Sequence, residues 1–160
     1  MAWLRGMVAY GAAILAIEAV GSVIGYATSQ AIEGWYDTLR KPPLNPPDAA
    51  FAIVWPILYA MIAVAGVMVW RTGDPRRRTA TIAYAAQLLV NFAWTGLFFT
   101  ARMPGAALAW IVLLLVLIGM TVRLFRPISR VAAALLLPYA AWVGFAAYLN
   151  AGILVAERIA

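Results

Sequence analysis

The chain contains no cysteine and no histidine among its 160 residues. Disulfide bonds are therefore excluded, and so are thiolate or imidazole ligands for zinc, iron or haem. Serine–histidine–aspartate and cysteine–histidine nucleophile arrangements are excluded for the same reason. We expect no metal site and no cofactor, and the two absences remove most hydrolytic chemistry before any motif is considered.

Charged residues are also scarce: they make up 11% of the chain, whereas a soluble domain usually carries about 25%. Long intervals contain no charge, and each can supply the roughly 20 residues with which a helix crosses a bilayer. We therefore predict an all-α integral membrane protein, a five-transmembrane-helix bundle that forms a single domain over residues 1–160. The spans are expected near residues 4–28, 50–71, 79–101, 103–124 and 131–156.

Basic residues are unevenly divided between the two sides that five spans define. The N-terminal side holds Arg5, Arg71, Arg76, Arg77, Arg78, Arg123, Arg126 and Arg130. The other side holds Arg40, Lys41, Arg102 and Arg158. Because basic loops stay in the cytoplasm, we expect the N-terminus there. The run at residues 76–78 is interpreted as an interfacial anchor, and no nucleic-acid partner is expected.

The first connection, roughly residues 29–49, is the long one, and it is rich in proline. Four prolines between residues 42 and 47 fix the backbone φ and favour extended geometry in the residues before them. Trp35, Tyr36 and Leu39 share a helical face, which predicts a short helix ahead of the prolines. Two interpretations stay open: a stiff spacer in the headgroup layer, and a functional lid.

Polar and aromatic side chains recur at helical spacing within three predicted spans. They are Trp55 and Tyr59 in the second span, Gln87, Asn91 and Trp94 in the third, and Tyr139, Trp142, Ala146 and Asn150 in the fifth. Amides in lipid need hydrogen-bond partners, so these stripes either join helices or line a cavity. An apolar cavity with a few convergent polar groups is the usual form of a small-molecule site.

The first span holds two further features. Glu18 is the one acidic residue well inside a span. An acidic side chain at that depth is by default a candidate for a functional role. Its role as a proton site, as a partner for a cationic ligand or as a protonated structural group stays open. Gly21 and Gly25 form a GxxxG pattern, which allows close approach by a helix of the same bundle or of a second copy.

Together these segments resemble the TspO/MBR family, also called the translocator protein or peripheral benzodiazepine receptor family. The first half of the match is Trp35-Tyr36, Leu39, Lys41-Pro42, Pro46-Pro47, Trp55 and Leu58-Tyr59. The second half is Gln87, Asn91, Trp94, Phe98-Phe99, Pro138-Tyr139, Trp142, Phe145-Ala146 and Leu149-Asn150. The resemblance implies a membrane protein with a pocket that the first connection closes as a lid.

The resemblance also implies a function: a membrane receptor or sensor that binds tetrapyrroles such as protoporphyrin IX and similar flat hydrophobic ligands. The alternatives are a porphyrin transporter and a light-dependent porphyrin-degrading enzyme, for which Trp55 and Trp142 are the candidate residues. The ligand-binding residues implied are Trp35, Tyr36, Trp55, Tyr59, Gln87, Asn91, Trp94, Tyr139, Trp142, Ala146 and Asn150.

The expected partners are a porphyrin or another hydrophobic small molecule, the lipid bilayer and a second copy in a homodimer. A sterol is not expected, because Ala151 follows Asn150 where the family's cholesterol motif has a tyrosine. Helical spans favour the cytoplasmic membrane of a bacterium, with the outer membrane as the alternative.

Overall fold

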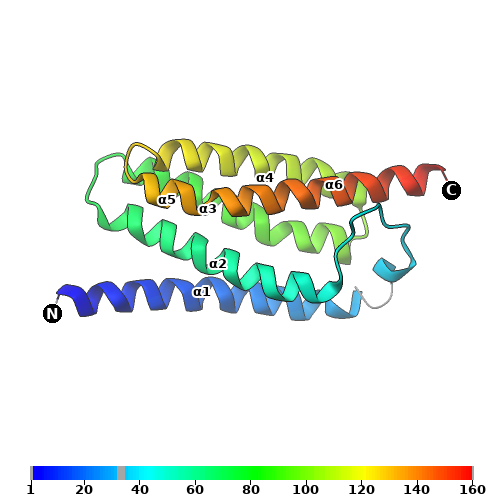
Figure 1. Cartoon of the computed structure of the whole chain (residues 1–160), viewed down its shortest axis with the longest axis horizontal. Helices are drawn as coiled ribbons and strands as arrows, with labels where there is room; N and C mark the ends of the chain where they lie inside the picture. The colour runs from blue at the N-terminus through cyan, green and yellow to red at the C-terminus, as the bar shows by residue number, and fades with distance from the viewer. Residues whose placement is uncertain (1, 32–34, 160) are drawn as a thin grey trace.

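Long apolar helices run side by side along the longest axis of the molecule (Figure 1). The computed structural model describes residues 2–31 and 35–159. In chain order the helices are α1 (Ala2–Ala31), α2 (Asp48–Arg71), α3 (Arg77–Thr95), the π-helical turn η2 (Gly96–Thr100), α4 (Pro104–Phe125), α5 (Arg130–Leu135) and α6 (Leu137–Ile159). In this part of the chain five segments are long and apolar enough to cross a membrane, and none of it forms a strand. The prediction of an all-α, five-helix membrane protein is confirmed.

The last predicted span, residues 131–156, is divided rather than continuous. Helix α5 ends at Leu135 and α6 begins at Leu137, so that Leu136 separates them. Pro138 follows directly, and a proline has no backbone N–H and its ring crowds the carbonyl four residues earlier. The proline therefore accounts for the interruption, and α5 and α6 together still form one membrane-spanning segment.

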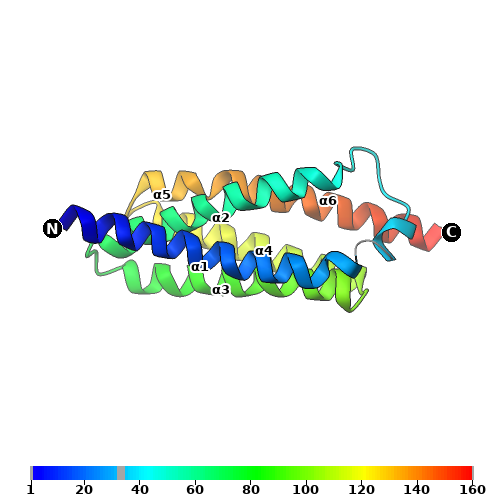
Figure 2. The same ribbon diagram turned by 90° about the horizontal axis from the view of Figure 1, so that it is seen from below.

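The helices differ in how deeply they are buried. Helix α1 lies at the outside of the bundle along α2 (Figures 1 and 2), and none of the most apolar stretch of its span is buried. The core lies between α2, α4, α5 and α6, where the large side chains are fully buried. Its members include Ile62, Ile111, Ile118, Leu136 and Val143. Most of the surface of α1 therefore lies outside the core of the bundle.

The two ends of the bundle carry different features. The N-terminus and the loops at 72–76 and 126–129 lie at one end, and the segment 35–47 lies with the C-terminus at the other (Figure 1). At the first end Arg76 binds Asp74 at 2.7 Å and donates to the carbonyl of Pro127 at 3.2 Å. The Arg76 hydrogen bonds lower the pKa of the Asp74 carboxyl to about 2. The two loops are thus joined, and Asp74 stays ionised at neutral pH.

Hydrogen bonds between side chains join α3 to its neighbours within the apolar interior. Tyr139 of α6 donates to Oε1 of Gln87 at 2.9 Å. Tyr59 of α2 donates to Oδ1 of Asn91 at 3.3 Å. Both amides are buried. The predicted amide stripe of the third span therefore contacts two other helices.

Replacing Tyr139 with phenylalanine is expected to lower the free energy of unfolding by about 1 kcal/mol, because the buried Gln87 loses its hydrogen-bond donor. Unfolding in mixed detergent micelles, followed by circular dichroism, measures the change. The double variant Tyr139→Phe with Gln87→Leu is the control. It should cost less than the sum of the two single changes, because neither partner is then left unpaired. Strict additivity would show that the bond contributes nothing.

Candidate ligand-binding cavity

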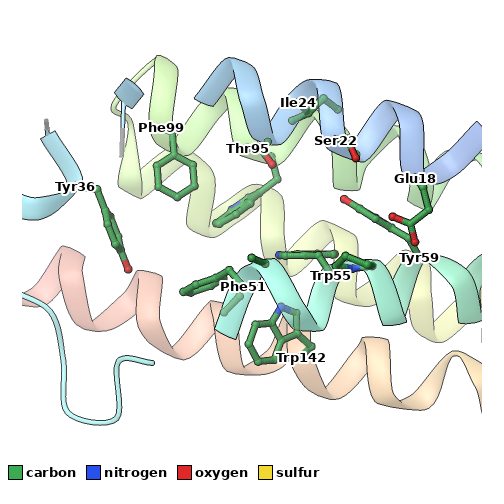
Figure 3. Close-up of a pocket in the computed structure, with 16 residues that line it drawn as sticks. Glu18, Ser22, Ile24, Tyr36, Phe51, Trp55, Tyr59, Thr95, Phe99 and Trp142 are labelled. Atoms are coloured by element: carbon green, nitrogen blue, oxygen red, sulfur yellow. The ribbon is translucent and has the colours of Figure 1, made fainter. Parts of the chain in front are cut away.

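A cavity of about 430 Å³ lies between α1, α2, α3, η2 and α6, at the end of the bundle that carries the segment 35–47 (Figure 3). Small-molecule sites usually have about 300–1,000 Å³. Seven of its sixteen lining residues are aromatic, and the rings come from every side except α1. They include Tyr36, Trp55, Tyr59, Trp94, Phe99 and Trp142.

The rings of the cavity wall are held in place by other rings. Trp55 and Tyr59, one turn apart on α2, have ring centroids 5.1 Å apart. Phe51 at the start of α2 meets Trp142 of α6 edge to face at 5.7 Å. Trp94 stacks on Phe98 of η2 at 5.3 Å. Such pairs add to the stability gained by burial. The aromatic side chains that line the cavity are therefore held in a defined arrangement by their neighbours.

The segment 35–47, called the lid segment below, contributes Tyr36 to one end of the cavity. Residues 35–38 form a helical turn, and Tyr36 and Leu39 are buried. The Tyr36 ring lies across the cavity from Phe51 in Figure 3 and meets the Phe99 ring at 5.5 Å. Its hydroxyl donates to Oδ1 of Asn45 at 3.1 Å, so the segment is also folded onto itself.

Helix α6 holds the far half of the lid segment. The Tyr148 hydroxyl donates to the carbonyl of Pro43 at 2.9 Å. The ring of Pro42 lies against Gly152 so closely that a Cβ at this glycine would come within 2.6 Å of it. No side chain other than hydrogen fits between them. The lid segment is thus attached to α6 by one hydrogen bond and one close backbone approach.

The structure divides the residues proposed from the sequence into three groups. Six of them line the cavity: Tyr36, Trp55, Tyr59, Trp94, Trp142 and Ala146. Asn150 lines a much smaller cavity of about 30 Å³ and, with its amide in the hydrogen-bonding orientation, donates to the carbonyl of Pro104 at 2.9 Å. The residues that line neither cavity are Trp35, Gln87, Asn91 and Tyr139. As ligand contacts, all eleven stay predictions.

Several lining residues were not proposed as site residues from the sequence. Phe51, Thr95 and Phe99 belong to this group. So does Ser22 of α1. Glu18, one turn earlier, was named from the sequence with its role left open between a proton site, a partner for a cationic ligand and a structural group. It also lines the cavity, and Figure 3 shows both residues on the cavity side of α1. The spacing of Glu18, Gly21, Ser22 and Gly25 is the signal that could have identified them, because positions i, i+3, i+4 and i+7 share one face.

Gly21 brings α1 against the cavity wall. A Cβ at this position would overlap the ring of Tyr59, whereas a Cβ at Gly11 of the same helix meets nothing within 4 Å. Gly21 of the GxxxG pattern therefore accommodates a helix of the same bundle. Gly25, its second member, lines the cavity.

Replacing Gly21 with alanine is expected to displace Tyr59 and to weaken its hydrogen bond to Asn91, because an overpacked site must shift its neighbours. We expect a loss of about 1–3 kcal/mol in the free energy of unfolding. Gly11→Ala is the matched control and should be neutral or slightly stabilising, because alanine is the better helix former. Equal effects of the two substitutions would contradict the close packing of Gly21 on Tyr59.

Fold and cavity together define the class: a multi-pass integral membrane protein whose helices surround an apolar cavity rich in aromatic side chains. The chain belongs to the TspO/MBR family, whose model matches residues 13–156. The tryptophan-rich protein TspO of Chlorobaculum tepidum is 40% identical over 138 residues, which cover 85% of this chain and 87% of that protein. The tryptophan-rich protein TspO of Archaeoglobus fulgidus is 34% identical over 142 residues, 89% of this chain and 92% of that protein.

Relatives are also found in animals. The translocator protein of Ovis aries is 37% identical over 133 residues, which cover 79% of each chain. The resemblance drawn from the sequence motifs is therefore confirmed at the level of the family.

Proposed function

We propose that this protein is a membrane receptor or sensor that binds tetrapyrroles, such as protoporphyrin IX, and similar flat hydrophobic molecules. The observation that carries the proposal is the cavity itself. Indole and phenol rings from three helices converge on it, with Trp55, Trp94 and Trp142 among them. Aromatic faces bind flat conjugated rings by offset stacking, and the lid segment adds the ring of Tyr36 at one end of the cavity.

Metal-free tetrapyrroles fit this chain better than haem. The sequence has no histidine and no cysteine, which are common axial ligands of haem iron. A free-base porphyrin needs only ring faces, apolar walls and hydrogen-bond partners at its edge. The cavity is lined by aromatic ring faces and apolar side chains, and the hydroxyl groups of Ser22 and Thr95 can serve as hydrogen-bond partners at the edge of the ligand.

We further propose that the end with the N-terminus and the loops at 72–76 and 126–129 faces the cytoplasm. Arg76, Arg77 and Arg78 lie at this end, and basic residues gather on the cytoplasmic side of membrane proteins. The lid segment then faces the opposite compartment. The homodimer and the bacterial cytoplasmic membrane stay predictions.

Titration of the protein in nanodiscs with protoporphyrin IX, in the dark, tests the binding function. Saturable quenching of tryptophan fluorescence is expected, and Trp142→Phe should weaken the apparent affinity. Trp110→Phe is the matched control, because that indole lies between α3 and α4 and donates to the carbonyl of Val90 at 2.9 Å. Linear quenching that is identical in all three proteins would mean that the porphyrin only partitions into lipid, and the proposal would fail.

A light-dependent porphyrin-degrading enzyme is the second candidate, and one observation favours it. Trp55 and Trp142, from different helices, both line the cavity and would flank a bound pigment. Illumination of the complex in air should then produce new absorption bands that are absent in the dark. The same bands in Trp142→Phe, or their appearance with free porphyrin in empty nanodiscs, would count against the enzyme.

A further inference from the structure

We infer that the α1 side of the cavity binds a positively charged group, so that this protein prefers flat aromatic amines to neutral or acidic ligands of the same shape. Glu18 is the residue that recognises the charge. The inference rests on the proposed binding function, because it requires that the cavity takes up a ligand. It goes further by naming the chemical class of that ligand.

The position of Glu18 is the first argument. It lies within the membrane-spanning stretch Trp3–Ala27 of α1 and lines the cavity. In Figure 3 its carboxylate points from α1 toward Tyr59 of α2. The close approach of Gly21 to Tyr59, one turn further along, shows that this face of α1 is packed against α2.

The missing counter-charge is the second argument. Charged residues inside a membrane almost always pair with one another or line a polar cavity. In the described part of the chain the ion pairs are Lys41 with Asp37 and Arg76 with Asp74, and no hydrogen bond or ion pair there involves Glu18. Arg5, the other charged residue of α1, is about 20 Å away along the helix axis. A carboxylate facing a cavity without a cation of its own is suited to accept one from a ligand.

The surrounding rings are the third argument. A cation is attracted to the faces of tryptophan and tyrosine, and binding of quaternary ammonium groups by several aromatic rings is a common form of recognition. Trp55 and Tyr59 lie beside Glu18 in the cavity wall. A carboxylate next to aromatic faces can bind the charge and the attached hydrocarbon of an amine together.

The same arrangement determines how an acidic tetrapyrrole would be oriented. Two carboxylates repel each other at close range, so acidic side groups would be directed away from Glu18 and toward the lid segment. Lys41 of that segment has its Nζ 4.5 Å from the centre of the Tyr36 ring, but it pairs with Asp37 and does not itself line the cavity. The orientation of an acidic ligand is therefore determined by repulsion from Glu18 alone.

Three probes with one flat ring system test the inference: pyrenylmethylamine, pyrenylmethanol and pyreneacetic acid, which are cationic, neutral and anionic at neutral pH. Energy transfer from the tryptophans to pyrene gives each Kd in nanodiscs of zwitterionic lipid. We expect the wild-type protein to bind the amine about tenfold more tightly than the alcohol, because the amine gains one charge-assisted contact with Glu18. The acid should bind more weakly than either.

Glu18→Gln, which keeps the size of the side chain, should abolish the preference for the amine and leave the Kd of the alcohol within about twofold. Glu157→Gln is the control, because it removes an equal charge from an exposed position near the C-terminus. Comparison between variants in identical nanodiscs cancels the unequal partitioning of the probes into lipid. The order of the three probes in the wild-type protein is a test that does not depend on how the variant folds.

The outcomes separate the two proposals. Saturable and equal binding of all three probes would overturn the role of Glu18 and leave the binding function intact. A preference for the amine that persists in Glu18→Gln would also overturn it, because the charge would then be recognised elsewhere. Absence of saturable binding for every probe would overturn the binding function itself, and the inference with it.

Discussion

Replacing Trp55 with alanine is expected to raise the Kd for protoporphyrin IX by about 30-fold, or ~2 kcal/mol. The substitution removes one face of the cavity. It also leaves Tyr59, 5.1 Å away, and Tyr139, 6.5 Å away, without the ring that positions them. A tryptophan quenching titration in the dark measures the change.

Trp70→Ala is the matched control for this prediction. Trp70 lies on the same helix, but its side chain is 55% exposed and its ring lies 5.0 Å from the guanidinium of Arg77 at the other end of the bundle. Its removal should alter the Kd by no more than about twofold. A similar loss in both variants would mean that α2 is generally destabilised, and no loss in either would exclude Trp55 from the site.

Replacing Gly152 with alanine is expected to speed the release of bound ligand about tenfold. The added methyl group would overlap the ring of Pro42, which is rigid and cannot turn aside, so the lid segment must move off α6. The hydrogen bond from Tyr148 to Pro43 lies one turn away and should weaken with it. Stopped-flow transfer of porphyrin from the loaded protein to empty nanodiscs measures the release rate.

Gly144→Ala is the control on the same helix, because a Cβ there meets nothing within 4 Å. It should leave the release rate unchanged and stabilise α6 slightly through its helix propensity. If both alanines speed release equally, the effect arises from α6 as a whole. If neither does, the lid segment does not control the exit of the ligand.

Much of this architecture could be predicted from the sequence, because the bilayer imposes it. Four charge-free intervals of sufficient length, and a fifth whose one charge is Glu18, give the five spans directly. The rigid character of the first connection follows from its prolines, which restrict φ wherever they occur. The aromatic stripes with Trp55 and Trp142 were visible because helical periodicity shows which residues share a face.

The remaining features depend on how the helices are placed relative to one another, which periodicity does not reveal. Gln87 and Asn91 share a face with Trp94, yet the amides pair with tyrosines of other helices while Trp94 lines the cavity. Likewise nothing local to Gly152 shows that a proline more than a hundred residues earlier will occupy the space beside it. Only the assembled bundle brings such residues together.

The attachment of the lid segment to α6 also has a consequence for the order of events during synthesis. Tyr148 and Pro43 are 105 positions apart in the chain, and a nascent chain emerges with its N-terminal part first. Residues 35–47 therefore leave the ribosome long before their binding surface on α6 exists. A chain arrested after α4 would contain four membrane spans and every residue of the lid segment, but it would lack the part of the cavity wall that Trp142 and Ala146 supply. Under the proposed binding function, retention of a ligand would begin only once α6 is in place, and it would report that this last span has been inserted.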